Sequence, residues 1–278
     1  MDQPIKNRVI VVTGAGGGFG QLISQKCAVL GARIVCADIN EEGLDQTITN
    51  ITEAGGQGIS QRTDVTSYSD LQALAAKAVN EFGAIDVMVN NAGTMPLAFY
   101  SDHAQAMAAW TRCIDINIKG VLHGIAAVHD QMISQGRGHV VNISSIYGNF
   151  PVVGAAVYGA SKAAVNFLSE SLRVEAQGKI KVTIVRPTGV PMTGLVGTIV
   201  NQEAIVGITG QNAEVTGARY AEILSGQAPP EVLDKDSIAY FGLDADSLTD
   251  QVVHAINQPW GVSIAEVTVR ASGERYVL

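Results

Sequence analysis

The sequence predicts a mostly parallel, doubly wound α/β sheet with helices on both faces. Short runs of apolar and β-branched residues alternate with helical patterns from Arg8 to Arg186. Such alternation is typical of parallel strands joined by crossover helices. A glycine turn and several polar residues fall directly after these strands. They should therefore gather at the carboxyl edge of the sheet, where such sheets bind ligands.

The composition favours one large domain over residues 1–278, because 47% of residues are hydrophobic and only 16% are charged. A formal net charge of −8 without a Lys or Arg run predicts neither a nucleic-acid nor a membrane partner. Met1–Arg8 is polar, so we expect no signal peptide. Cys27, Cys36 and Cys113 lack disulfide or metal-ligand spacing, which predicts free thiols, no metal site and a cytoplasmic protein.

The first strand leads into a candidate phosphate site. Arg8–Thr13 contains four consecutive β-branched residues, which predicts a strand buried on both faces. The glycine-rich stretch 13–20 then opens a helical pattern. Glycine lets the backbone approach an anion, and a helix N-terminus supplies unpaired N–H groups. The spacing does not match Gly-x-Gly-x-x-Gly, so a glycine turn without a ligand remains the alternative.

The second strand, Arg33–Asp38, ends in a carboxylate. In dinucleotide-binding sheets an acid at this point accepts hydrogen bonds from the adenosine ribose, and its charge repels the additional phosphate of NADP. Asp38 is therefore a candidate for selecting NAD. The alternative is a solvated carboxylate at the end of a strand.

The alternation of strands and helices continues along the chain. Further helices are expected at Glu41–Ala54, Tyr68–Phe82, Ala104–Gln135, Val157–Val174 and Asp246–Ile256, the last capped by Asp244 or Ser247. Further strands are expected near Gly58–Arg62, Ile85–Asn90, His139–Ile143, Lys181–Arg186 and Ile264–Val269. The alternation breaks between Thr188 and Leu243. This predicts an irregular or partly helical excursion over the ligand edge, with residues 194–243 as a substrate lid.

Tyr158 and Lys162 lie four residues apart in one of these helices, so they project from the same face. A free phenol has a pKa of about 10, and a nearby ammonium group favours the phenolate. The pair is therefore a candidate general acid/base, in which Lys162 lowers the pKa of Tyr158. By itself the pair also fits an ordinary helix surface.

Taken together, these motifs and their order resemble the short-chain dehydrogenase/reductase family, in its single-domain branch with a Rossmann-like sheet of about seven strands. The resemblance covers Arg8–Pro187 continuously and returns weakly at Leu243–Val269. It is carried by Thr13-Gly14-x-x-x-Gly18-x-Gly20, Asp64-Val65, Asn90-Asn91-Ala92-Gly93, Asn117, Ser144-Ser145 and Tyr158-x-x-x-Lys162.

The resemblance implies a role for each of these residues. At the adenosine end of the cofactor, Asp38 would bind the ribose, and Asp64 and Val65 would flank the adenine. The diphosphate would lie along Gly14, Gly18, Phe19 and Gly20. At the nicotinamide end, the ribose would be bordered by Asn91, Ala92 and Gly93, and the carboxamide would be reached by Pro187, Thr188 and Val190. At the reacting centre, Tyr158 would exchange a proton with the substrate, Lys162 would hold the ribose hydroxyls, Ser145 would bind the substrate oxygen, and Asn117 would hold a water that links Lys162 to solvent.

The family places its serine thirteen residues before the tyrosine, which selects Ser145 over Ser144. Two departures stand out. Many members have Pro-Gly where this chain has Pro187-Thr188, and the basic residue that favours NADP is missing from the glycine turn. The second departure agrees with Asp38 in predicting NAD.

The resemblance implies an NAD-dependent oxidoreductase that interconverts a secondary alcohol and a ketone. The candidate lining of the substrate pocket is apolar or aromatic, namely Met95, Leu97, Tyr147, Phe150, Val152, Val153, Met192 and Leu195. The lid holds only Arg219 and Lys235 as basic residues, which favours an uncharged hydrophobic or aromatic alcohol. Two alternatives remain, a ketone reductase acting on a steroid or biosynthetic intermediate and a non-catalytic NAD-sensing or scaffold protein. By analogy with the family, the apolar helices predict a homo-oligomer, either a dimer or a homotetramer.

Overall fold

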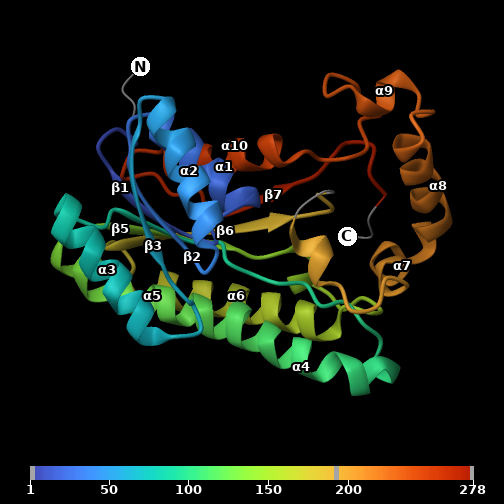
Figure 1. Cartoon of the computed structure of the whole chain (residues 1–278), viewed down its shortest axis with the longest axis horizontal. Helices are drawn as coiled ribbons and strands as arrows, with labels where there is room; N and C mark the ends of the chain where they lie inside the picture. The colour runs from blue at the N-terminus through green and yellow to red at the C-terminus, as the bar shows by residue number, and fades with distance from the viewer. Residues whose placement is uncertain (1–3, 191–193, 276–278) are drawn as a thin grey trace.

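The structure, a computed structural model, describes residues 4–190 and 194–275. Seven strands form one sheet in the order β3-β2-β1-β4-β5-β6-β7, and neighbouring strands pair in parallel (Figure 1). The strands are β1 (Val9–Thr13), β2 (Arg33–Asp38), β3 (Gln57–Arg62), β4 (Val87–Asn90), β5 (Gly138–Ile143), β6 (Ile180–Pro187) and β7 (Glu266–Val269). The predicted parallel, doubly wound sheet is confirmed.

Helices cover both faces of this sheet. One face carries α1 (Gly18–Val29), α2 (Glu41–Glu53) and α10 (Ala245–Ile256), and the other carries α3 (Tyr68–Phe82), α4 (His103–Ile114), α5 (Gly120–Ser134) and α6 (Ala156–Glu175) (Figure 1). The long helical region expected at Ala104–Gln135 is confirmed, but residues Asp115–Lys119 between α4 and α5 form a π-helix. Such turns occur frequently at functional sites. Asp244 is the N-cap of α10, where its side chain accepts a hydrogen bond from the backbone N–H of Ser247.

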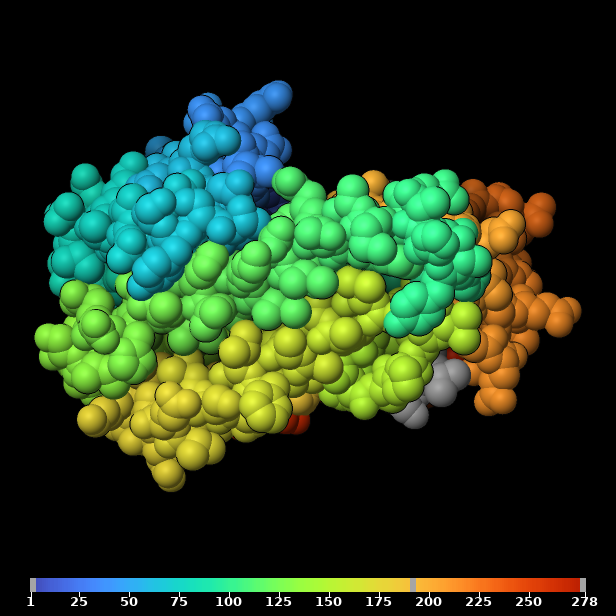
Figure 2. Space-filling view, turned by 90° about the horizontal axis from the view of Figure 1, so that it is seen from below, coloured from blue at the N-terminus to red at the C-terminus, as the bar shows by residue number. Residues whose placement is uncertain are grey.

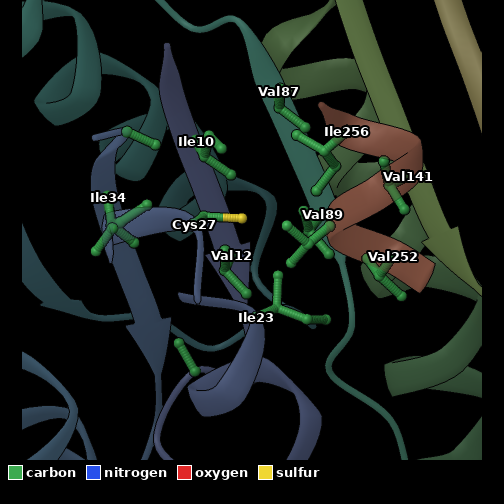
Figure 3. Packing of buried hydrophobic residues seen from close by; sticks show 14 of the residues in the cluster. Ile10, Val12, Ile23, Cys27, Ile34, Val87, Val89, Val141, Val252 and Ile256 are labelled. Atoms are coloured by element: carbon green, nitrogen blue, oxygen red, sulfur yellow. The ribbon is translucent and has the colours of Figure 1, made fainter. Parts of the chain in front are cut away.

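Burial on both faces explains the continuous apolar sequence of β1. Alternate residues of this strand belong to two separate cores, Ile10 and Val12 to one and Val9 and Val11 to the other. In the first core, the strand residues meet side chains from the helices above them (Figure 3). The labelled residues are Ile10, Val12, Ile34, Val87, Val89 and Val141 from the strands, Ile23 and Cys27 from α1, and Val252 and Ile256 from α10. This packing fixes the glycine turn between β1 and α1 against a rigid base.

The segment between β6 and α10 forms short helices at one end of the sheet, beyond its carboxyl edge (Figure 1). They are η4 (Gly194–Thr198), α7 (Ala204–Thr209), η5 (Gly210–Asn212), α8 (Ala213–Leu224) and α9 (Pro230–Leu233). The backbone N–H groups of Val200 and Asn201 donate to the carbonyl of Leu97. A Cβ on Gly207 would lie 2.0 Å from the carbonyl oxygen of Val153. The partly helical excursion expected from the sequence is confirmed, and it is anchored to the loops that follow β4 and β5.

Figure 2 shows the face of the molecule made by α4 and α6 together with the adjoining part of α5. Several large apolar side chains on α4 and α6 are exposed, including Met107, Phe167 and Val174. In the described ranges, no helix is long and apolar enough to cross a membrane.

Candidate active site

The glycine turn is held closely against the end of β4. Gly14 has a φ of 67°, a left-handed conformation that favours glycine. A Cβ on Gly14 would lie 2.8 Å from Nδ2 of Asn91, and a Cβ on Gly20 would lie 2.1 Å from the carbonyl oxygen of Gly14. The Asn91 amide donates to the carbonyls of Thr13 and Gly14 at 2.9 and 3.2 Å. Asn91 therefore holds the turn in place, in addition to lining the cavity beside it.

Asp38 points from the end of β2 toward the same turn. Its Oδ2 accepts a hydrogen bond from the backbone N–H of Gly16, and its Oδ1 accepts one from Asn40, both at 2.9 Å. The carboxylate is thus fixed beside the glycines, as a ribose-binding acid requires. Following β3, Asp64 binds the backbone and hydroxyl of Thr66 through Oδ1. Val65 next to it is buried.

Tyr158 and Lys162 both lie on α6, and both are 5% exposed. The Lys162 Nζ lies 5.8 Å from the centroid of the Tyr158 ring and donates to the carbonyl of Ile143 at 2.8 Å. Ser145, which follows β5, hydrogen-bonds the Tyr158 side chain. Ser145, Tyr158 and Lys162 are therefore brought together at one cavity.

The protonation states of this trio differ from the sequence expectation. Burial raises the pKa of Tyr158 to about 12, although the hydrogen bond with Ser145 lowers it. Burial also lowers the pKa of Lys162 to about 8. The pKa of Tyr158 is therefore raised overall, because burial outweighs the lowering expected from Lys162. The physical reason is that both groups lose their hydration, while the ammonium donates to the Ile143 carbonyl.

Asn117 lies in the π-helix below this trio, and its side chain bonds two segments. Its Oδ1 accepts from the N–H of Thr94, and its Nδ2 donates to the Thr94 carbonyl and to the hydroxyl of Ser161. The Ser161 hydroxyl in turn donates to the carbonyl of Tyr158 at 2.7 Å. Sequence reasoning missed Ser161, which braces α6 from the residue before Lys162. The water-binding role of Asn117 stays a prediction.

The two neighbouring serines have separate roles. The hydroxyl of Ser144 donates to Asn166 Oδ1 at 2.7 Å and also lies 3.2 Å from the carbonyl oxygen of Lys162. Ser144 therefore attaches the end of β5 to α6. Ser145 Oγ accepts a hydrogen bond from the N–H of Tyr147. These contacts give Ser144 a structural role.

One cavity of about 810 Å³ joins these features. Of the residues proposed for the site, all except Gly20 and Asn117 line it, namely Gly14, Gly18, Phe19, Asp38, Asp64, Val65, Asn91, Ala92, Gly93, Ser145, Tyr158, Lys162, Pro187, Thr188 and Val190. Gly20 lies in the first turn of α1 against the Gly14 carbonyl, and Asn117 hydrogen-bonds Ser161 of α6. Both act on the cavity through the residues that they contact.

The substrate end of the cavity is mostly apolar. Of the expected lining residues, Met95, Leu97, Tyr147 and Leu195 border it. Phe150 and Val152 pack against the core beside it, and Met192 lies outside the described residues. The prediction for Val153 is wrong, because its side chain is 66% exposed and its backbone contacts Gly207 instead. The lid adds residues that the sequence pattern did not single out, namely Val196, Ile199, Ile205, Ile208, Tyr220 and Leu224.

Arg112 of α4 also lines the cavity and was not foreseen. Sequence reasoning considered only the basic residues of the lid. Of these, Arg219 pairs with Glu222 and Lys235 with Asp244.

The three cysteines are buried and free, as expected. Burial raises the pKa values of Cys27 and Cys36 to about 12, so both are neutral at ordinary pH. Among residues 4–190 and 194–275, no group of three or more His, Cys, Asp or Glu side chains is placed to hold a metal ion.

A parallel sheet with a glycine turn after β1, an acid after β2 and a Ser-Tyr-Lys trio at its carboxyl edge defines the class of nicotinamide-dependent oxidoreductases. The model of the short chain dehydrogenase family matches residues 8–204. The chain therefore belongs to the short-chain dehydrogenase/reductase family.

Relatives of this chain agree with that assignment. An uncharacterized oxidoreductase of Listeria innocua is 34% identical over 95% of this chain and 96% of its own length. A short-chain dehydrogenase/reductase from Burkholderia phymatum in complex with NAD is 27% identical, with a TM-score of 0.74, over 95% of this chain and 89% of that one. A metagenomic short-chain oxidoreductase in complex with NADP is 28% identical, with a TM-score of 0.72, over 96% and 98% of the two chains. Similar structures thus contain either nicotinamide cofactor.

Proposed function

We propose that this protein is an NAD-dependent oxidoreductase that interconverts a secondary alcohol and a ketone, with an uncharged hydrophobic or aromatic substrate. The observation that carries the proposal is that Ser145, Tyr158 and Lys162 meet in the cavity that also contains the glycine turn and Asp38. A binding or scaffold protein would not need the three polar side chains at the buried end of such a cavity.

The residues present fit a dinucleotide. The positive φ of Gly14 and Gly18 shapes a cradle at the N-terminus of α1, where a diphosphate would meet unpaired N–H groups. Lys162 has three donors, one of which binds Ile143, so two remain for ribose hydroxyls. When bound, the nicotinamide supplies hydride acceptance or donation at the substrate carbon.

The chain supplies the proton chemistry. In alcohol oxidation, Tyr158 takes the hydroxyl proton while Ser145 hydrogen-bonds the substrate oxygen and holds it near the phenol. The phenolate form required for this step is costly in the buried site. The positive charge of Lys162 stabilises that form, because the attraction between the two charges is weakly screened in a buried site. Because the cellular NAD pool is mostly oxidised, we expect oxidation of the alcohol as the physiological direction.

We expect neutral aryl or alicyclic secondary alcohols to be better substrates than short 2-hydroxy acids, with kcat/KM at least about tenfold higher. The reason is that a carboxylate would be buried among the apolar lid residues. The measurement is NADH formation across a panel that contains both classes. A preference for hydroxy acids that disappears in Arg112→Ala would instead identify Arg112 as a carboxylate clamp and refute the proposed substrate class.

We expect Asp38→Ala to weaken NADH binding by about tenfold, since the ribose hydroxyls lose a charged acceptor. The same change removes the charge that repels the NADP phosphate, so the preference for NADH over NADPH narrows. Fluorescence titration with both cofactors measures the two constants. Asp45→Ala, at an exposed position of α2, is the matched control. Tighter binding of NADPH than of NADH by the wild-type protein would contradict the assignment of NAD.

We also propose a homo-oligomer that forms through α4 and α6. The exposed fractions of Met107, Phe167 and Val174 are 56%, 76% and 74%. Large apolar side chains exposed on these two helices favour burial against a second copy, and Figure 2 shows α4 and α6 together on one face of the molecule. The molar mass in solution, from light scattering, tests this proposal.

A further inference from the structure

The turn that follows β7 places a buried carboxyl group against the cofactor side of the cavity. Glu274 has a side chain with 0% exposure. Its Oε2 accepts a hydrogen bond from the hydroxyl of Thr188 at 2.9 Å and lies 3.3 Å from the backbone N of Ala271. Thr188 lines the cavity directly after β6. A residue near the C-terminal end of the chain therefore contacts the loop expected to receive the carboxamide end of the cofactor.

The carboxyl group is poorly paired for its degree of burial. Its Oε1 has no hydrogen-bond partner, and Nε of Arg270 lies 3.3 Å away as an ion pair. Burial raises the pKa of Glu274 to about 7, although Thr188 and Arg270 lower it. The phenol of Tyr147 lies close enough to both Glu274 and Tyr220 for electrostatic interaction.

The Thr188 hydroxyl has two acceptors but only one proton. Besides Glu274, it reaches the carbonyl of Val269 at 3.1 Å. An ionised carboxylate is a stronger acceptor than a carbonyl, so the Thr188 hydroxyl donates its hydrogen bond to Glu274. The lone pairs of the hydroxyl oxygen then remain unused. A protonated Glu274 instead donates to that oxygen, and the Thr188 proton turns to Val269. The first state leaves both lone pairs of the Thr188 oxygen free to accept a hydrogen bond from a ligand amide, whereas in the second state Glu274 occupies one of them.

We propose that Glu274 is a positioning residue that sets the direction of the Thr188 hydroxyl. Through that hydroxyl, it makes binding of the cofactor carboxamide depend on pH. This inference rests on the proposed binding of a nicotinamide cofactor. The ionised state of Glu274 is the state that favours binding. Affinity for NADH therefore rises with pH as Glu274 loses its proton.

The test is the dissociation constant of NADH, measured by fluorescence from pH 6 to pH 8.5. We expect wild-type affinity to rise about fivefold over this range, the size of one hydrogen bond. Glu274→Gln has no proton to lose at this position, so its NADH affinity should lack the rise that ionisation of Glu274 produces in the wild type. Because Lys162 also titrates near this range, the quantity that decides is the difference between the two profiles. Ser272→Ala, in the same turn and exposed, should behave as wild type.

Thr188→Val removes the hydroxyl that pairs with Glu274, so the NADH affinity of this variant should also lose its dependence on pH. Thr188→Ser keeps the hydroxyl and should retain that dependence.

Cofactor-free protein gives an independent readout. Because the pKa of Glu274 is raised in the folded state, its contribution to stability is present below about pH 4.5 and is lost as pH rises through about 7. The melting temperature of Glu274→Gln relative to wild type should therefore increase over that interval.

Parallel NADH profiles for wild type and Glu274→Gln would overturn this proposal and leave the proposed function standing. Failure of the wild-type protein to bind NADH or NADPH at any pH would overturn the proposed function and, with it, this inference.

Discussion

Tyr158→Phe should lower kcat by about 10³-fold, within the range of 10²–10⁴ that general acid–base catalysis contributes. The substitution removes one oxygen atom and keeps the ring, which packs in the core cluster with Leu97 and Tyr147. Affinity for NADH should change by no more than about twofold, since the phenol exchanges its proton with the substrate. Stopped-flow measurement of a single turnover with a saturating secondary alcohol separates this loss from product release.

Tyr147→Phe provides a matched control, because its hydroxyl donates to the carbonyl of Ile208 in the lid. This change should raise KM more than it lowers kcat. If Tyr158→Phe retained wild-type turnover, the assigned acid/base would be wrong, and the hypothesis of a non-catalytic cofactor-binding protein would gain support.

Gly20→Ala should be a strongly damaging single-methyl substitution near the proposed cofactor site. The new Cβ would lie 2.1 Å from the Gly14 carbonyl oxygen and 2.6 Å from the Asn91 amide, so the turn or α1 must move. We expect a loss of about 2–3 kcal/mol in the free energy of unfolding and at least about tenfold weaker NADH binding. Chemical denaturation and fluorescence titration measure these two effects.

Gly217→Ala in α8 is the control for adding a methyl group. A Cβ there meets nothing within 4 Å, and alanine is favoured over glycine inside a helix by about 1 kcal/mol. We expect equal or greater stability and unchanged NADH binding. Wild-type NADH affinity in Gly20→Ala would show that the close approach of α1 to Gly14 is not required.

Local patterns predicted much of the fold and of the site. The β-branched run of β1, the glycine turn and the spacing of Tyr158 and Lys162 are each set by a few adjacent residues. Their physical causes, which are burial on two faces, backbone freedom and helix periodicity, can be recognised in the sequence itself.

The features that were missed depend on contacts between distant segments. Ser161 gains its role from a hydrogen bond to Asn117, 44 residues away, and Glu274 meets Thr188 across 86 residues. The pKa of Tyr158 depends on how completely the folded chain excludes water, which helix spacing does not determine. Val153 does not line the cavity, because its backbone packs against Gly207, which has no side chain to keep the two backbones apart.

The attachment of α7 has a consequence for protein engineering. The residues assigned to proton exchange follow β5 or lie on α6. Many of the apolar residues that line the cavity come from one continuous segment, residues 194–224. A combinatorial library confined to that segment would vary selectivity without altering the reacting groups. Position 207 must stay glycine in such a library, since any larger residue would separate the variable segment from its scaffold.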